Sequence, residues 1–429
     1  MTLAPEEIRA LSVDAVVAAV NAGTLSASAV AEAFLAVIDA REDAVGAFET
    51  IDRAAVRAAA AAVGGGPLAG ITLGVKDVIE TADLPTGYGS TVYAGARPLW
   101  DAPVVTIARS LGAVVMGKTV STEFAMSGPG RTRNPWNPGH TPGGSSSGSA
   151  AAVGTGMLHA ALGTQTSGSI LRPAAYCGAV GYKPSFGTLV RVGVKALSDS
   201  LDTVGMIART VADAGAVTAA LAEAPKLAAA ALDRPPRIGI FRSSRWDLAE
   251  PATREALARA AAAAEAAGAS VVEVAVPDWF EELYRCHDAV MGWETPRALA
   301  HERAVFADRI APPTRAFLDT LARTTRADYD AALARIADRA GILDALIGDC
   351  DVLFTPAATG EAPAGLGATG DPVFCKVWTL LHGPALAVPA GFGPNGLPVA
   401  VQVVGRLGRD AETLAAAAFA EAALKDATS

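Results

Sequence analysis

Hydrophobic positions change their spacing several times along this chain of 429 residues. In residues 5–62 they recur every three or four positions, as in LSVDAVVAAV and AVAEAFLAVIDA, which predicts helices with Ser26 and Ser28 as candidate N-caps. Residues 280–348 and about 410–425 are also predicted to be helical. Short apolar runs predict buried strands at 71–79, 113–118, 237–241, 271–276, 351–357, 385–391 and 399–405.

The predicted strands alternate with helical segments such as VVTIARSLG, and this alternation is typical of an α/β fold with a parallel or mixed sheet. Two Gly-rich stretches interrupt the pattern. Residues 127–148 have no periodicity and are dense in Gly, Pro, Ser and Asn, which is typical of long functional loops. The next segment, SAAAVGTGMLHAALG, is predicted to be a helix that leads into a second Gly/Ser turn, TQTSGS.

Composition and charge exclude several classes of protein. A net charge of −9 argues against a nucleic-acid binder, and 51% hydrophobic residues argue against disorder. The acidic N-terminus and the lack of a long uncharged apolar run predict neither a secretion signal nor a membrane span, so we expect a cytoplasmic protein. No C-x-x-C pair or histidine ligand spacing occurs, so we expect no disulfide framework and no metal.

Candidate chemistry is concentrated in three segments. Lys76 lies within the apolar run ITLGVKDVI, where a buried charge would need a reason, although most lysines are surface groups. The Gly-rich turns in 141–154 and 163–178 both carry serines. Such turns leave successive backbone N–H groups free and suit an oxyanion hole.

Two motif matches point to other chemistry. Residues 112–119 match the P-loop pattern G-x-x-x-x-G-K-[ST], but AVVM there is predicted to be a strand rather than a phosphate-binding loop. A nucleotide hydrolase built on Lys118 is therefore the rival from another class of function. Residues 144–148 match the nucleophile elbow G-x-S-x-G, but a loop rather than a strand precedes Ser146.

The three segments together resemble the amidase signature family. They read GVKD at 74–77, GGSSSGSA at 143–150 and GTQTSGSILRPAAYCG at 163–178, with 24 residues from Ser145 to Ser169, the spacing usual in that family. Flanking segments such as PLAGITLGVKD, GKTVSTEFA, KPSFG and GLPVAVQVVG also fit. The resemblance covers nearly the whole chain and is weakest at about 235–345.

The resemblance implies one α/β/α domain over residues 1–429, with a central twisted mixed sheet covered by helices. Its core would span about 60–215 and 350–425, with a variable helical pocket region at about 235–345. It also implies a Ser–cis-Ser–Lys triad, in which Ser169 is the nucleophile, Ser145 relays the proton and Lys76 is the base. The oxyanion would face the backbone N–H groups of Thr166, Ser167, Gly168 and Ser169.

Three residues depart from the family pattern. Gln165 stands where many members have Asp, and Ser167 stands where Gly is usual, so a left-handed backbone there would be strained. Arg172 follows Ser169 by three positions rather than the commoner two, as in a malonamidase-like subset. It would either bind a substrate carboxylate or pair within the fold.

The implied function is hydrolysis of the C–N bond of small amides, such as anilides and aliphatic amides, with carbamates or urethanes as further candidates. The alternative within the family is a glutamine-amidotransferase component, which would work with partner proteins and tRNA. For the main interpretation we expect a small-molecule substrate, no cofactor, no nucleic-acid or membrane partner, and a monomer or homodimer. Candidate substrate-binding residues are Arg172, Met126, Gly144, Tyr88, Cys375 and Trp378.

Overall fold

A computed structural model describes residues 3–126, 128–228 and 231–427. The described strands form one sheet in the order β1-β3-β2-β4-β6-β5-β10-β11-β9-β7-β8. The pairs of β2 with β3 and β4, and of β7 with β8 and β9, are parallel, and the other pairs are antiparallel. The strands are β1 (Phe48–Thr50), β2 (Thr72–Lys76), β3 (Val114–Thr119), β4 (Ala160–Gln165), β5 (Val180–Lys183), β6 (Thr203–Ala208), β7 (Arg237–Phe241), β8 (Ser270–Val274), β9 (Val352–Pro356), β10 (Ala385–Phe392) and β11 (Pro398–Val404).

The seven predicted strands are confirmed as β2, β3 and β7–β11, with ends that differ by at most a few residues. The helix predicted after residue 148 is wrong in its second half. The chain turns at Gly156, which has a φ of 77°, and Ala160–Gln165 forms strand β4. This strand is buried throughout between β2 and β6, so its sequence lacks the alternation that marks a half-exposed strand.

The helical predictions for the N-terminal and 280–348 regions are confirmed, apart from the short strand β1 and the turns between helices. Ser26 caps α3 by accepting a hydrogen bond from the N–H of Ala29, whereas Ser28 lies inside that helix. The helices are α1 (Pro5–Ala10), α2 (Val13–Asn21), α3 (Ala27–Val45), α4 (Arg53–Ala61), α5 (Pro103–Ser110), α6 (Ser147–Gly154), α7 (Leu171–Cys177), α8 (Val211–Leu221), α9 (Pro251–Ala266), α10 (Phe280–Ala298), α11 (Ala300–Val305), α12 (Pro312–Leu321), α13 (Arg326–Arg335), α14 (Arg339–Ile347), α15 (Val373–Leu380) and α16 (Asp410–Asp426).

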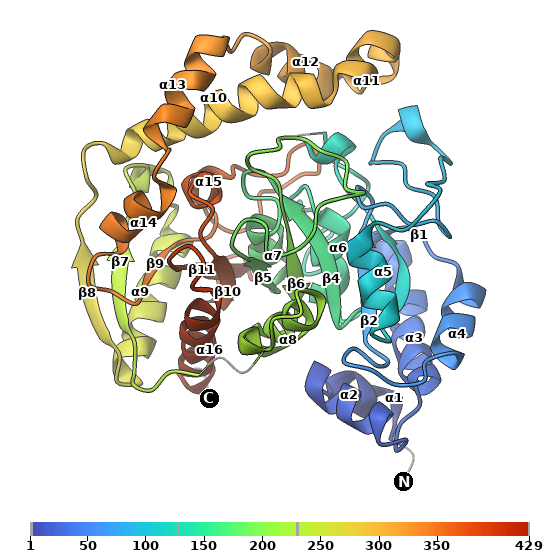
Figure 1. The fold of residues 1–429 in the computed structure, drawn as a ribbon. Helices are drawn as coiled ribbons and strands as arrows, with labels where there is room; N and C mark the ends of the chain where they lie inside the picture. Colours follow the sequence, from blue (N-terminus) through green and yellow to red (C-terminus); the bar gives the residue numbers. More distant parts are fainter. Residues whose placement is uncertain (1–2, 127, 229–230, 428–429) are drawn as a thin grey trace.

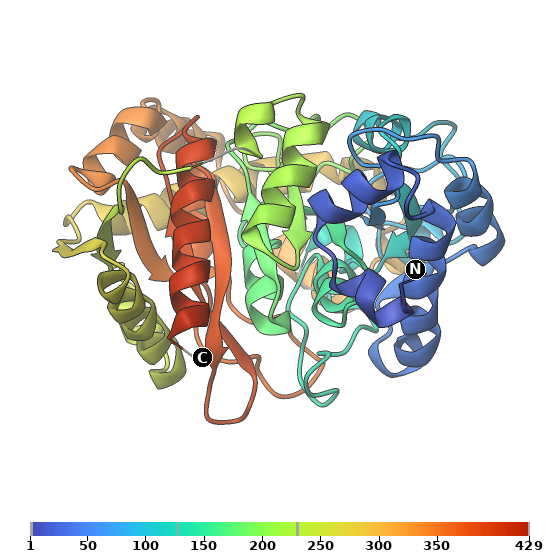
Figure 2. The same ribbon diagram turned by 90° about the horizontal axis from the view of Figure 1, so that it is seen from below.

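Helices cover both faces of the sheet, which gives an α/β/α sandwich (Figures 1 and 2). Helices α8, α9 and α16 pack together over β6, β10 and β11 and face the viewer in Figure 2. Helices α6 and α7 pack together on the other face, over β4 and β5. The region at about 235–345 is not only helical, because its strands β7 and β8 complete one edge of the sheet.

Helices α10, α12 and α13 form a separate layer across the end of the molecule that lies away from both termini (Figure 1). Helix α10 packs against α12, α13 and α15. This layer lies over the turns that precede α6 and α7, the two Gly-rich segments singled out from the sequence. Within the described ranges, no helix combines the length and apolar character that crossing a bilayer requires.

Candidate active site

Lys76 ends the central strand β2, and its side chain is fully buried. Its Nζ lies 2.7 Å from Ser145 Oγ, 2.7 Å from Thr164 Oγ1 and 3.3 Å from the Thr164 carbonyl oxygen. Burial lowers the pKa of Lys76 from 10.5 to about 7, although the charge of Asp202 opposes the shift. A lysine that is partly neutral at pH 7 can accept a proton from the Ser145 hydroxyl, as a general base must.

Asp77 does not restore the charge of Lys76, because it contacts a different lysine. Its carboxylate lies 3.2 Å from Lys118 Nζ and accepts a hydrogen bond from the N–H of Gly87. Lys118 is fully buried in strand β3 and also donates to Thr86 Oγ1. The backbone at residues 114–119 is therefore a strand, and the loop that a P-loop phosphate site needs is absent from this described segment.

Ser145 lies in the first Gly-rich turn, just before α6 begins at Ser147. The peptide bond between Gly144 and Ser145 is cis. A Cβ at position 144 would lie 2.7 Å from Thr369 Cγ2, so any residue other than Gly would force that side chain to shift. The first turn is joined to the second by a hydrogen bond from the N–H of Ser146 to the carbonyl of Ser169, at 3.2 Å.

The second turn joins β4 to α7 and ends in Ser169. Within the described chain, no atom accepts a hydrogen bond from the N–H groups of residues 166–169, so these donors are free for an oxyanion. Gln165 stabilises the turn, because its Oε1 accepts the N–H groups of Ile170 and Leu171 at 2.8 and 3.0 Å. Ser169 contacts a pocket and retains slight exposure.

Ser167 adopts no left-handed conformation, so the strain considered for a non-Gly residue does not arise there. Its hydroxyl lies 3.2 Å from His287 Nε2 and 3.6 Å from Met291 Sδ, both on α10. The described atoms show no direct hydrogen bond between Ser145 and Ser169, and such catalytic contacts are often longer before substrate binds.

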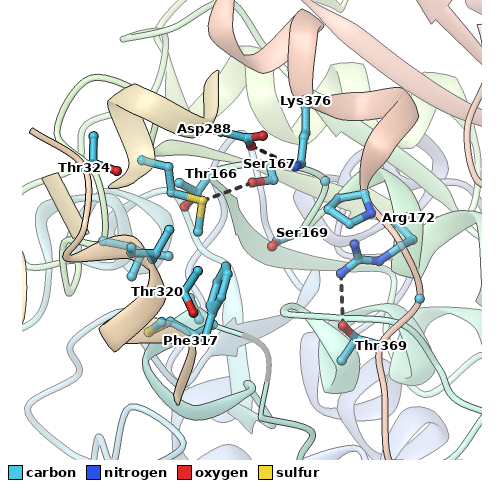
Figure 3. Close-up of a pocket in the computed structure, with 18 residues that line it drawn as sticks. Thr166, Ser167, Ser169, Arg172, Asp288, Phe317, Thr320, Thr324, Thr369 and Lys376 are labelled. Carbon is cyan, nitrogen blue, oxygen red and sulfur yellow. Dashed lines mark hydrogen bonds and ion pairs between the residues drawn. The ribbon is translucent and has the colours of Figure 1, made fainter. Parts of the chain in front are cut away.

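A pocket of about 450 Å³ opens directly above Ser169. Figure 3 shows Phe317, Thr320 and Thr324 along one side, Lys376, Arg172 and Thr369 along the other, and Ser169 between them. The apolar part of its wall comes from Met126, Leu197, Met291, Phe317, Leu321 and Pro372. The pocket therefore combines an apolar surface with the guanidinium of Arg172 and the ion pair of Lys376 with Asp288.

Arg172 is buried beside the pocket, and only one of its guanidinium nitrogens has hydrogen-bond partners among the described residues. Its Nη2 donates to the carbonyl of Gly144 at 2.7 Å and to Thr369 Oγ1 at 3.3 Å. Its Nε and Nη1 have no partner among the described residues. One edge of the guanidinium therefore holds the turn at 144–145, which favours a role within the fold, while Nε and Nη1 are unpaired but covered by protein atoms.

The other candidates differ in where they lie. Met126 lines the pocket, but Gly144, Tyr88, Cys375 and Trp378 do not. Tyr88 donates to Glu80 at 3.0 Å, and Trp378 is buried among Phe241 and Phe280. Cys375 packs against Gly168 of the second turn, and burial raises the pKa of its thiol to about 12. Gly144 acts through its carbonyl, which Arg172 holds.

Several residues of the site were not found from the sequence. His287, Asp288 and Met291 come from α10, Phe317 and Thr320 from α12, and Thr369, Pro372 and Lys376 from the segment leading into α15 and its start. Lys376 Nζ lies 2.9 Å from Asp288 Oδ1 at the pocket. None of the three segments carries a local motif; the helical spacing of 280–348 and the candidates Cys375 and Trp378 were the signals that pointed to them.

Comparison with known proteins finds relatives that match most of the length of this chain. The family model Amidase matches residues 29–414. A glutamyl-tRNA(Gln) amidotransferase subunit from Anaeromyxobacter sp. (strain K) is 34% identical, over 91% of each chain. A crystal structure described as an amidase is 30% identical, covers 96% of this chain and 99% of its own, and has a TM-score of 0.86.

A second solved structure, the native peptide amidase from Stenotrophomonas maltophilia, is 29% identical over 96% of each chain, with a TM-score of 0.81. The family model and the amidotransferase relative each span most of the chain, including all three motif segments. The chain therefore belongs to the amidase signature family of hydrolases that act on carbon–nitrogen bonds.

Proposed function

We propose that this protein hydrolyses small amides through an acyl-enzyme on Ser169. The observation that carries the proposal is the 2.7 Å contact between Lys76 Nζ and Ser145 Oγ, next to the turn that carries Ser169. A buried lysine with a pKa of about 7 supplies a base at neutral pH. The pocket above Ser169 supplies the space for a substrate carbonyl.

In the first half of the reaction, Ser169 Oγ attacks the amide carbonyl carbon and its proton passes through Ser145 to Lys76. The oxyanion is held by the free N–H groups of the turn at 166–169. The C–N bond then breaks as Ser145 gives a proton to the leaving amine and regains one from Lys76. Water attacks the acyl-enzyme along the same route and releases the acid.

The pocket favours a short substrate. Its volume of about 450 Å³ lies in the lower part of the range for small-molecule sites. Apolar side chains from α10 and α12 suit an aliphatic or aromatic group, which fits anilides, aliphatic amides and aryl carbamates. Arg172 lines the pocket, and a substrate carboxylate that reached its guanidinium would find Nε and Nη1 without other partners.

Initial rates on a small panel test the substrate class. The panel holds a neutral anilide, a short aliphatic amide, an aryl carbamate, the monoamide of a short dicarboxylic acid, and a long-chain fatty amide. We expect the short acyl amides to be cleaved at least about tenfold faster than the fatty amide, because the pocket is too small for a long chain. A preference for the fatty amide would contradict the proposal.

The role of Arg172 is tested by a ratio between substrates. Arg172→Met should lower kcat/KM for the dicarboxylic monoamide about 10- to 100-fold more than for the neutral amide, because only the monoamide loses a charged hydrogen bond. Equal losses on both substrates would mean that Arg172 acts only through the Gly144 carbonyl. Thr369→Val is the matched control, since it removes the neighbouring hydroxyl and leaves the cation in place.

A glutamine-hydrolysing component of an amidotransferase is a second candidate, because a curated relative with 34% identity over 91% of both chains carries an amidotransferase role in its name. Glutamine is itself a small amide with a carboxylate, so the same site would serve. This candidate predicts that glutamine is the best substrate of the panel and that a partner protein stimulates its hydrolysis. Slow glutamine hydrolysis beside fast cleavage of another short amide would favour the stand-alone enzyme.

A further inference from the structure

His287 is a fully buried histidine that the proposed reaction does not use. It lies on α10, outside the three motif segments, yet its ring reaches the turn at 166–169. Its Nε2 is 3.1 Å from the carbonyl oxygen of Thr166 and 3.2 Å from Ser167 Oγ. Its Nδ1 is 3.4 Å from Asp288 Oδ1.

The shorter contact decides that Nε2 carries a hydrogen, because Nε2 lies 3.1 Å from the Thr166 carbonyl whereas Nδ1 lies 3.4 Å from the other acceptor, Asp288. A carbonyl oxygen only accepts hydrogen bonds, so Nε2 must carry a hydrogen to bind Thr166. In this state Nε2 cannot take a proton from Ser167. The order Ser167–His287–Asp288 copies that of a serine-hydrolase triad, but the tautomer argues against Ser167 as a second nucleophile.

The contact instead fixes a peptide plane. In a trans peptide the carbonyl and the following N–H point in opposite directions, so holding the Thr166 carbonyl also sets the direction of the Ser167 N–H. The next peptide is held in the same manner, because Thr379 Oγ1 lies 2.9 Å from the Ser167 carbonyl. Both N–H groups that these contacts orient belong to the proposed oxyanion hole.

We propose that His287 is a positioning residue, whose Nε2–H holds the Thr166 carbonyl and the Ser167 hydroxyl so that the oxyanion hole keeps its geometry. This inference rests on the proposed function, because it assigns the turn at 166–169 to an oxyanion. The two contacts of His287 Nε2, with Thr166 and with Ser167, form a clamp on the turn, and a glycine at position 167 would lack the second contact. Helix α10, which forms part of the pocket wall, is thereby tied to the catalytic turn.

Steady-state kinetics on His287→Ala, His287→Gln and Ser167→Gly test the clamp, with a short amide as substrate. His287→Ala should lower kcat about 10- to 100-fold, somewhat less than the loss of an oxyanion donor itself, with little change in KM. His287→Gln should recover kcat to within about fivefold of wild type, because its amide N–H can reach the same carbonyl. Ser167→Gly should lose less than His287→Ala, and the double variant should match His287→Ala.

Val290→Ala is the matched control, because Val290 is a buried α10 residue outside the pocket lining. It should lower Tm without lowering kcat. Loss of kcat in His287→Ala no larger than in Val290→Ala would overturn the proposal. So would a folded His287→Gln enzyme as slow as His287→Ala, and His287→Gln compared with wild type decides the matter alone if His287→Ala fails to fold.

The rate at which a phosphonyl fluoride labels Ser169 separates this inference from the proposed function, since the labelled phosphorus also places an oxygen in the hole. A wild-type protein that is labelled but cleaves none of the amides would reject the proposed substrates, while the labelling rates of the His287 variants would still decide its role. A wild-type protein that is neither labelled nor active would overturn both.

Discussion

In the proposed reaction, the pH dependence should follow from the ionisation of Lys76. All the hydrogen-bond partners of Lys76 Nζ are uncharged oxygens. Burial lowers the pKa of Lys76, and the charge of Asp202 raises it. The carboxylate of Asp202 has hydrogen-bond partners of its own, because it accepts hydrogen bonds from Thr166 Oγ1 and from the N–H groups of Leu197 and Ser198. Burial therefore remains the dominant effect on the pKa of Lys76.

The pH profile should report this lysine directly. Because its pKa is lowered from 10.5 to about 7 and the base must be neutral, kcat/KM should rise with pH below about 7 and level off above about 8. Lys76→Ala should remove this ionisation and about 10³- to 10⁴-fold of the rate. An unchanged pH profile in the variant would place the base elsewhere.

The lowered pKa of Lys76 also makes the free energy of unfolding depend on pH. Between about pH 7 and 10.5 the unfolded chain binds more protons at this residue than the folded chain does, so the contribution of Lys76 to the free energy of unfolding rises with pH. Lys76→Met should therefore gain most relative to wild type near pH 7, and the difference should shrink towards pH 10. Urea denaturation of both proteins at several pH values measures it.

Replacement of Ser169 gives a second test of a single residue. Ser169→Ala should abolish hydrolysis and phosphonyl labelling without lowering Tm by more than a few degrees, because the hydroxyl contacts the pocket rather than the core. Ser110→Ala, on the exposed end of α5, is the control and should keep full activity. Labelling that persists in Ser169→Ala would remove this serine from the role of nucleophile.

At the scale of elements, the sequence predicted those whose signal is local. Strands β2 and β7 have compact apolar runs, and the two serines proposed to be catalytic lie in turns whose composition is unusual enough to resemble a family. Strand β4 was predicted to be a helix because its alanines favour helices and because both of its faces are buried. The residues that line the pocket from α10 and α12 were missed, since tertiary packing alone brings Met291 and Phe317 to the same pocket as Ser169.

Helix α12 offers a test of how those walls select substrates. Phe317 is half-buried at the pocket, so Phe317→Ala should enlarge it and raise kcat/KM for longer acyl chains about tenfold relative to short ones. Leu318→Ala is the control, because Leu318 is buried on the same helix but does not line the pocket. A loss of activity on all substrates alike would mean that Phe317 only stabilises the helix.

For the whole molecule, the order of strands in the sheet separates the chain into two parts. The strands β1–β6 occupy one side and β7–β11 the other, and the two sides meet where β5 pairs with β10. The pocket draws on both parts, because Ser169 and Arg172 come from the first and Asp288, Phe317 and Lys376 from the second. The proposed catalytic residues and most of the pocket wall thus come from different halves of the chain.

The pairing of β5 with β10 therefore resembles a contact between two separate proteins that happen to share one polypeptide. Ala228 is exposed, so the chain can be divided after this residue. Fragments 1–228 and 229–429 should reassociate when produced together, driven by the apolar surface that each would otherwise expose. Neither fragment alone holds a complete pocket, so amide hydrolysis would appear only on association. Its dependence on the concentration of the second fragment would measure the affinity of one half for the other.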